Sequence, residues 1–334
     1  MKLATELTGA ADGRLLVVSR DLEHCAPADG IAGTLQDALD HWDEVKAALE
    51  ARYERLNERD IADARPLDAV ALAAPLPRAW QWLDGSVFPT HGELMQKAFD
   101  MAPIESDGPL MYQGMSHRFL SPTEDVPFPS EQDGIDFEGE FGVITGEVPL
   151  GTQPADAARC IRLAVQINDW SLRRMAPLEM RTGFGFIHAK PACSIAPVAV
   201  TLDELGTAWA NGRITATLET WRNDERFGAV PATEAAYGFE DLIAHAARTR
   251  MLSAGTIIGS GTVSHSGFRQ YGSCCIAERR AIEIIDRGAP ATPFLSFGER
   301  VRMQARAPTS DIPLFGAIDQ RVVRAVNPAT RSRQ

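Results

Sequence analysis

The sequence predicts a β-rich protein of the α+β class. Many short runs of strand-forming residues, unequal in length, are separated by turn residues such as Asn211–Gly212, and few helical patterns interrupt them. Regular alternation of strands with helices is missing, and no G-x-G-x-x-G motif opens a helix, which disfavours a doubly wound sheet. Many strands with few helices therefore indicate an α+β fold.

The N-terminal part, residues 1–75, is expected to form a small domain of its own. "KLATEL" and "LLVVSR" read as two strands joined by a turn at "GAADGR". Thr34 can cap a helix, because apolar residues recur at helical spacing from Leu35 to about Leu56. The Pro-rich stretch 62–80 is expected to be extended and to lead into the second domain, residues 76–334.

The second domain is predicted to consist mainly of strands. Two helices are expected within it, one over residues 154–160 and one over 238–252, with Gly255 just past the end of the second. The strand-like runs are "FEGEFGVITGEV", "RLAVQINDWS", "ACSIAPVAV", "RITATLETWR", "GTIIGSGTV" and "RVRMQARA".

The bulk composition is that of an ordinary globular protein. The chain has 334 residues, of which 45% are hydrophobic and 23% charged. Its net charge of -12 argues against nucleic acid and anionic membranes as partners. No apolar run approaches the roughly 18 residues of a membrane span, and no signal peptide is visible. The five scattered cysteines show no CxxC spacing, so a cytoplasmic protein without disulfides or thiolate-bound metal is expected.

Three acids stand at every second position of the stretch "GIDFEGEFGVITGE". Side chains at this spacing share one face of a strand, so Asp136, Glu138 and Glu140 are expected to project together. The simplest interpretation is a solvated strand face. The apolar run from Phe141 to Ile144 instead suggests a strand buried on both faces. Carboxylates gathered there would need a hard divalent cation, Mg²⁺ or Ca²⁺, with Mn²⁺ also compatible.

Further acids could complete such a site. Asp169 follows an apolar strand in "AVQINDWSLRR", although an acid in that place commonly starts a turn. Asp84 and His91 lie seven residues apart around a Gly/Pro-containing loop, where an ordinary Asp-Gly turn and a structural histidine are the alternative.

Taken together and in this order, these stretches resemble the fumarylacetoacetate hydrolase family. The resemblance runs from about Trp80 to Ala325 and rests on "DFEGEFGVITG", "INDWSLR", "KPACSIAPV", "GSGTVS" and "LFGAIDQ". It implies a mixed β-sandwich roll, commonly a homodimer, preceded by a small N-terminal α+β domain. It also implies a cytoplasmic enzyme of tyrosine or other aromatic-compound degradation.

The resemblance assigns roles to individual residues. The implied metal ligands are Asp84, Glu138, Glu140 and Asp169, while Asp136 matches none of them and is left to support the site or to lie exposed. His91 resembles the general base and Glu278 the acid that orients it. Lys190 and Arg173 match cationic groups near the reacting carbonyl, and Tyr112 and Thr262 match substrate contacts.

The implied reaction is metal-dependent hydrolysis of a carbon–carbon bond in a 1,3-diketo acid, such as fumarylacetoacetate or a related acylpyruvate. One departure concerns the substrate: related hydrolases carry an arginine shortly after the histidine, where this chain has only Lys97. Arg118 is a possible substitute. The alternatives are a decarboxylase, tautomerase or hydratase of 2-oxo acids on the same scaffold, a catalytically idle metal-binding protein, and an interaction module.

Overall fold

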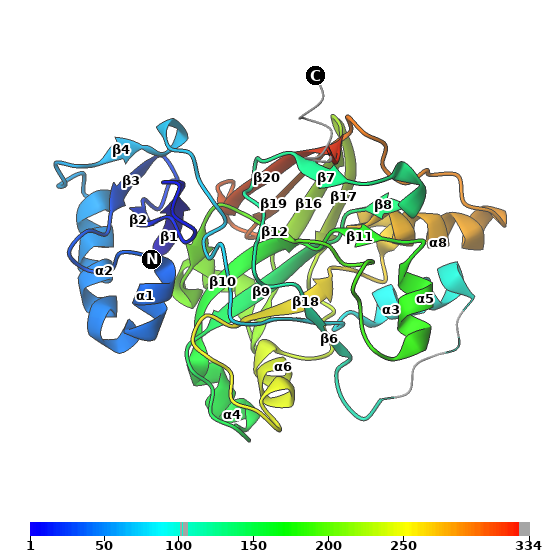
Figure 1. Cartoon of the computed structure of the whole chain (residues 1–334), viewed down its shortest axis with the longest axis horizontal. Coiled ribbons are helices and arrows are strands. Elements are labelled where there is room, and N and C mark those ends of the chain that lie inside the picture. The colour runs from blue at the N-terminus through cyan, green and yellow to red at the C-terminus, as the bar shows by residue number, and fades with distance from the viewer. Residues whose placement is uncertain (101, 103–105, 327–334) are drawn as a thin grey trace.

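The computed structural model describes residues 1–100, 102 and 106–326 and confirms the β-rich α+β class. Two sheets form its centre (Figure 1). The larger has eleven strands, of which ten lie in the order β4-β3-β2-β1-β13-β10-β9-β18-β5-β6 and β12 pairs with β10. The smaller has five strands in the order β17-β16-β19-β20-β7. The strands of the larger sheet are β1 (Lys2–Glu6), β2 (Arg14–Val18), β3 (His24–Pro27), β4 (Arg65–Pro66), β5 (Trp82–Gly85), β6 (Met111–Gly114), β9 (Gly139–Thr145), β10 (Ile161–Asn168), β12 (Ser194–Ile195), β13 (Ala199–Val200) and β18 (Ile257–Thr262).

The remaining elements surround these sheets. The strands of the smaller sheet are β7 (Val126–Phe128), β16 (Thr217–Arg222), β17 (Glu225–Pro231), β19 (Arg300–Arg306) and β20 (Pro313–Arg324). Two short ladders pair β8 (Ile135–Asp136) with β11 (Ser171–Leu172), and β14 (Trp209–Ala210) with β15 (Arg213–Ile214). The helices are α1 (Leu35–Asp40), α2 (Trp42–Asn57), α3 (Pro89–Phe99), α4 (Pro154–Ala157), α5 (Ala176–Thr182), α6 (Phe239–Ala246), α7 (Phe268–Tyr271) and α8 (Ile276–Arg287), with 3₁₀ turns at η1 (Leu67–Ala69), η2 (Glu131–Asp133), η3 (Ala158–Cys160) and η4 (Leu202–Ala208).

The N-terminal strands are part of the larger sheet. Lys2 and Leu3 of β1 pair with Val200 and Ala199 of β13, so β1–β4 extend the sheet that carries β9 and β10. The helix expected after Thr34 forms, but it is divided at His41 into α1 and α2, which cover this end of the sheet (Figure 1).

The central strands β9 and β10 are buried on both faces. On one face Phe141 of β9 meets Phe315 of β20 with ring centroids 6.1 Å apart, so the smaller sheet covers this side. On the other face Leu163 and Val165 join a second apolar cluster. The expectation from the apolar run in β9 is therefore met, and any carboxylate on these strands lies in the interior.

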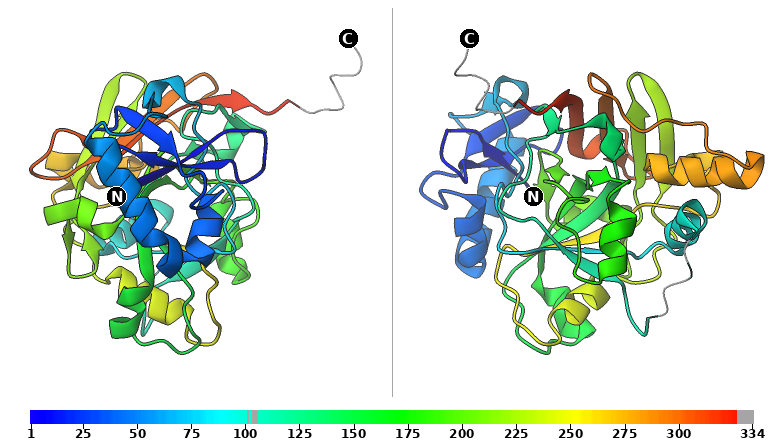
Figure 2. Two further views of the ribbon diagram at one scale, coloured as in Figure 1. Left: turned by 90° about the vertical axis from the view of Figure 1, so that its left-hand side faces the viewer. Right: turned by 45° about the vertical axis from the view of Figure 1, so that its right-hand side comes forward.

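Several elements differ from the sequence-based expectation. The helix expected over 238–252 ends at Ala246, and the acidic stretch is divided, because Phe137 and Glu138 lie between β8 and β9. Helices α3, α5 and α8 were not predicted. Figure 2 shows α8 and α3 on the side of the molecule opposite the N-terminal strands, where Leu94 of α3 packs against Ala281 and Ile282 of α8. Within the described residues, no helix is long and apolar enough to cross a membrane.

Candidate active site

Three carboxylates that are distant in sequence meet inside the larger sheet. Asp84, Glu140 and Asp169 are buried, and each offers an oxygen within 4.8 Å of the others. They come from β5, from β9 and from the residue that follows β10. The structure therefore brings together three of the four carboxylates that the family resemblance assigns to a metal.

Sheet register explains this meeting. Glu140 of β9 is opposite Thr262 of β18 on one side and opposite Ile167 of β10 on the other. Asp84 of β5 is opposite Gly259 of β18, where a Cβ atom would come within 2.3 Å of the Asp84 carboxylate. Only glycine fits there without displacing the acid. The backbone N–H of Gly261 donates to Asp84 Oδ1 at 2.9 Å and fixes its direction.

The three buried carboxylates repel one another, and a bound cation would offset this repulsion. Burial raises the pKa of Asp84 and of Glu140, and the neighbouring carboxylates raise both further. One oxygen of Glu140, Oε2, is buried and has no hydrogen-bond partner among the described residues. A buried all-oxygen donor set with an unused carboxylate oxygen fits a hard divalent cation such as Mg²⁺, Mn²⁺ or Ca²⁺.

Glu138, the fourth predicted ligand, lies beside this cluster between two cations. Its Oε1 accepts from Arg173 Nη2 at 2.6 Å, and its Oε2 accepts from Ser171 Oγ at 3.1 Å and from the Lys190 ammonium. Burial would raise the pKa of Glu138, but Arg173 and Lys190 lower it to well below its ordinary range. Lys190 Nζ also donates to Asp169 Oδ2 at 2.6 Å, so this lysine joins Glu138 to the three-carboxylate cluster.

Asp136, which had no assigned role, is completely buried, and like Glu138 it bonds to Arg173. Its Oδ2 accepts from Arg173 Nε at 2.8 Å and from the backbone N–H of Ala277 at 2.9 Å, and its Oδ1 accepts from the N–H of Ile276 at 2.7 Å. The possibility of an exposed Asp136 is therefore wrong. The strand expected to carry all three acids is interrupted after Asp136, and this acid joins Arg173 to the start of α8.

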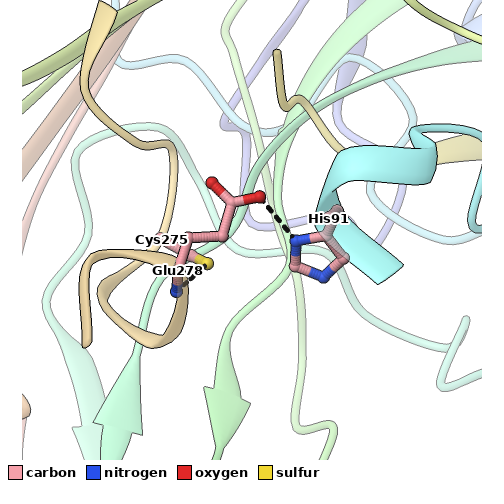
Figure 3. A group of neighbouring side chains, drawn as sticks. All are labelled: His91, Cys275 and Glu278. Atoms are coloured by element: carbon pink, nitrogen blue, oxygen red, sulfur yellow. Dashed lines mark hydrogen bonds and ion pairs between the residues drawn. The ribbon is translucent and has the colours of Figure 1, made fainter. Parts of the chain in front are cut away.

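His91 and Glu278 form a hydrogen-bonded pair (Figure 3). His91 Nδ1 and Glu278 Oε1 are 2.9 Å apart, and the histidine side chain is 13% exposed against 1% for the glutamate. Pro89 occupies the first turn of α3, which places His91 near the start of that helix. Glu278 is the third residue of α8, whose N-cap is Cys275. The pairing expected from the resemblance is thus present, although its helical setting was not predicted.

The predicted substrate contacts divide into two groups. Tyr112 and Thr262 lie at the cluster: the Tyr112 hydroxyl donates to Asp169 Oδ2 at 2.5 Å, and Thr262 Oγ1 is 3.5 Å from Glu140 Oε1. Lys97 is exposed and lies about 120° around α3 from His91. Arg118 is exposed and its guanidinium is paired with Glu124. The structure therefore does not bring Lys97 or Arg118 to the cluster.

Sequence reasoning missed two side chains that contact the candidate ligands. The thiol of Cys193 donates to Asp169 Oδ1 at 3.0 Å, and the Ser171 hydroxyl donates to Glu138. Burial and the Asp169 charge raise the pKa of Cys193 well above its usual value, so the thiol keeps its proton and can donate. Closeness in sequence to predicted site residues could have identified both, because Cys193 is three residues after Lys190 and Ser171 is two after Asp169.

Family comparisons cover almost the entire chain. Residues 81–323 match the family model described as fumarylacetoacetate (FAA) hydrolase C-terminal. Residues 1–78 match the model described as fumarylacetoacetase N-terminal domain 2. No curated protein matches the chain.

Solved structures share the fold at low sequence identity. A Mycobacterium smegmatis protein provisionally assigned as HpcE is 19% identical with a TM-score of 0.67, covering 98% of this chain and 100% of that one. Maleylpyruvate hydrolase from Sphingobium sp. SYK-6, in complex with manganese(II) and pyruvate, is 20% identical with a TM-score of 0.63, over 98% and 100%. The 5-carboxymethyl-2-hydroxymuconate delta-isomerase from Mycobacterium smegmatis is 15% identical with a TM-score of 0.58, over 98% and 100%.

Proposed function

The chain belongs to the fumarylacetoacetate hydrolase family, and on that premise we propose that it is a metal-dependent hydrolase that cleaves a carbon–carbon bond in a 1,3-diketo acid. The proposed substrate is fumarylacetoacetate or a related acylpyruvate. The observation that carries the proposal is the His91–Glu278 pair, 2.9 Å between Nδ1 and Oε1, in a fold whose central strands bury three carboxylates together. Hydrolysis needs a base that activates water, and this pair supplies one.

Asp84, Glu140 and Asp169 would hold the divalent cation, with Glu138 as the fourth predicted ligand. The solved relative that binds manganese supports a divalent cation for this chain. When bound, the cation supplies a Lewis acid that polarises the keto groups of the substrate.

His91 is assigned the proton transfer. Its Nδ1–H donates to Glu278 Oε1, which leaves the lone pair of Nε2 free to accept a proton from water. The resulting hydroxide adds to the carbonyl carbon of the acyl group. The bond between that carbon and the neighbouring carbon then breaks, and the departing enolate takes the proton from the His91 imidazolium and becomes the ketone. Glu278 stabilises the charged imidazole during this sequence, because its buried carboxylate lies against the ring.

Lys190 is the better placed of the two candidate cations for the developing alkoxide. Its ammonium reaches the edge of the carboxylate cluster, 2.6 Å from Asp169 Oδ2, and a fixed cation there would stabilise negative charge as the hydroxide adds. The Arg173 guanidinium, in contrast, contacts Glu138 and Asp136, and neither of these is one of the three clustered carboxylates. These contacts favour a positioning role for Arg173, which fixes Glu138.

The test is metal-free protein supplied with Mg²⁺, Mn²⁺ or Ca²⁺ and assayed for loss of the ultraviolet absorbance of fumarylacetoacetate and simpler acylpyruvates. We expect metal-dependent cleavage into two acids. His91→Ala should lose on the order of 10²–10⁴-fold in rate, and Glu138→Ala should abolish activity. His41→Ala, an exposed histidine of the N-terminal region, is the matched control.

Product analysis separates hydrolysis from the isomerase chemistry named for one solved relative. Nuclear magnetic resonance spectra of the products distinguish two separate acids from a tautomer with an intact carbon skeleton. Conversion to a tautomer alone, with His91→Ala as active as the unmodified protein, would rule out the proposed hydrolysis.

A further inference from the structure

The thiol of Cys275 lies beside the His91–Glu278 pair (Figure 3) and belongs to a different group of potential ligands from Asp84, Glu140 and Asp169. A ring nitrogen of His91, the sulfur of Cys275 and a carboxylate oxygen of Glu278 all lie within 4.8 Å of one another. Cys275 and Glu278 are almost completely buried, at 0% and 1% exposure. The proposed hydrolysis uses the histidine and the glutamate but gives the thiol no task.

Two packed helices hold the three side chains in place. Cys275 is the N-cap of α8 and Glu278 is its third residue, and the sulfur accepts the Glu278 backbone N–H at 3.3 Å. Side chains at these two positions meet in front of a helix end, as in a capping box. The packing of Leu94 against α8 brings the start of α3, and with it His91, to the same point. Three potential ligands therefore converge from rigid elements.

We propose that His91, Cys275 and Glu278 form a second metal site, which takes Zn²⁺ or another thiophilic divalent cation and thereby inhibits the enzyme. Histidine nitrogen, cysteine sulfur and glutamate oxygen are all zinc ligands, and three protein ligands with a water in the fourth position make a complete tetrahedral site. The carboxylate cluster, built from oxygen donors, suits harder cations instead.

The spacing of the three donors suits this ion. Zn²⁺ bonds of about 2.0–2.3 Å place neighbouring ligands roughly 3.5 Å apart, so donors that lie within 4.8 Å of one another need only small side-chain rotations to reach the ion. Binding replaces the thiol proton, which passes to water, and breaks the His91–Glu278 hydrogen bond. Because the bound metal occupies the imidazole and its orienting carboxylate together, the general base is lost.

The chain provides matched controls for the thiol. Cys274 is the neighbouring residue and equally buried, but it is not one of the three clustered ligands. Cys193 contacts Asp169 at 3.0 Å, so a soft cation bound among the carboxylates would contact Cys193 instead. Serine variants of these two cysteines therefore separate the proposed site from its neighbours.

The experiment titrates the Mg²⁺-loaded protein with Cd²⁺, a spectroscopic substitute for Zn²⁺, and records the ultraviolet thiolate-to-metal charge-transfer band. We expect the band to saturate at one Cd²⁺ per chain, to vanish in Cys275→Ser, and to persist in Cys274→Ser and Cys193→Ser. His91→Ala keeps the thiol and should weaken Cd²⁺ binding by more than about tenfold. In the enzyme assay, the Zn²⁺ concentration for half-inhibition should rise by more than about tenfold in Cys275→Ser, each variant being compared with its own activity without zinc.

Either of two results would overturn the proposal. One is a band that survives in Cys275→Ser or disappears in Cys193→Ser, which would move the soft metal to another thiol. The other is Cd²⁺ binding by His91→Ala as tight as that of the unmodified protein. The band does not depend on turnover, so it tests the zinc site even if the protein cleaves no diketo acid.

Discussion

Replacing Asp136 with asparagine should cost about 3–5 kcal/mol of folding free energy, because it breaks the junction between Arg173 and α8. The carboxylate accepts three hydrogen bonds, one from Arg173 Nε and two from the backbone N–H groups of Ile276 and Ala277. An asparagine has a single acceptor oxygen, so its amide N–H₂ must face either Ile276 or the pair formed by Arg173 and Ala277. All of these groups are donors, and the buried side chain has no room for solvent.

The magnitude follows from two losses. A buried backbone donor left without a partner costs about 1–3 kcal/mol, and a lost charge-assisted bond costs a similar amount. The sum agrees with the roughly 3–5 kcal/mol observed when one partner of a buried ion pair is removed. Burial raises the pKa of Asp136, and this desolvation penalty offsets part of what the ionised form contributes; Arg173 opposes the shift. We therefore expect the lower half of the range.

Urea unfolding measures the effect, with the midpoint reporting the loss at an unchanged slope. Asp286→Asn is the matched control, since this acid lies on the same helix in an exposed pair with Arg269 and should cost less than about 1 kcal/mol. The rate constant kcat should also fall, with KM little changed, because α8 carries Glu278. An Asp136→Asn midpoint no lower than that of Asp286→Asn would refute the reasoning.

Three further predictions concern the site and the surface. Glu140→Gln should raise the thermal midpoint of the metal-free protein by a few degrees, because it relieves repulsion among the clustered carboxylates. It should also remove the stabilisation by Mg²⁺, because it deletes a ligand. Calorimetry with and without Mg²⁺ measures both changes in the midpoint. Gly259→Ala should abolish Mg²⁺ binding in the same experiment, since the added methyl group collides with the Asp84 carboxylate. Burial alone would raise the pKa of Glu299, but the hydrogen bonds from Arg222 outweigh burial, and the pKa is lowered overall. The stability that the ionised Glu299 contributes is therefore present at neutral pH and is lost as the pH falls below the ordinary carboxyl value of about 4.3. Glu299→Gln should thus cost about 1 kcal/mol at pH 7 and progressively less in acid, as urea unfolding at several pH values would reveal.

The sequence indicated the candidate site better than its surroundings. Period-two acids alone are compatible with a solvated strand face, and it was the apolar run beside them that favoured buried carboxylates, which repel one another unless a cation lies between them. The family resemblance then joined Asp84, Asp169 and His91 to them. The alternation of acids could not show that the strand is interrupted after Asp136, because the interruption depends on the pairing of β8 with β11 and on the start of α8.

Helix α8 shows why the supporting structure was harder to predict. Its sequence "IAERRAIEIIDR" places Ala277, Ala281 and Ile282 at i, i+4 and i+5 on one buried side, which is a helical pattern. The preceding Cys274–Cys275 pair is typical of a buried strand, and this obscures where the helix begins. Cysteine is not among the preferred N-cap residues, so local rules give no start signal. The cap is made by the sulfur and reinforced from a distance by Asp136.

The arrangement of charges suggests a reason for the presence of Asp136 beside Glu138 and Glu140. Arg173 is buried among carboxylates, and with Glu138 alone it would be neutralised but free to turn about that single contact. Asp136 takes Nε while Glu138 takes Nη2, so the guanidinium is fixed at two of its nitrogens. Because Asp136 also holds the backbone at the start of α8, any shift of Glu278 and His91 is transmitted to Glu138. The proposed general base and the carboxylates are therefore connected through Arg173 and Asp136, and the proposed hydrolysis would need such support to place its water accurately.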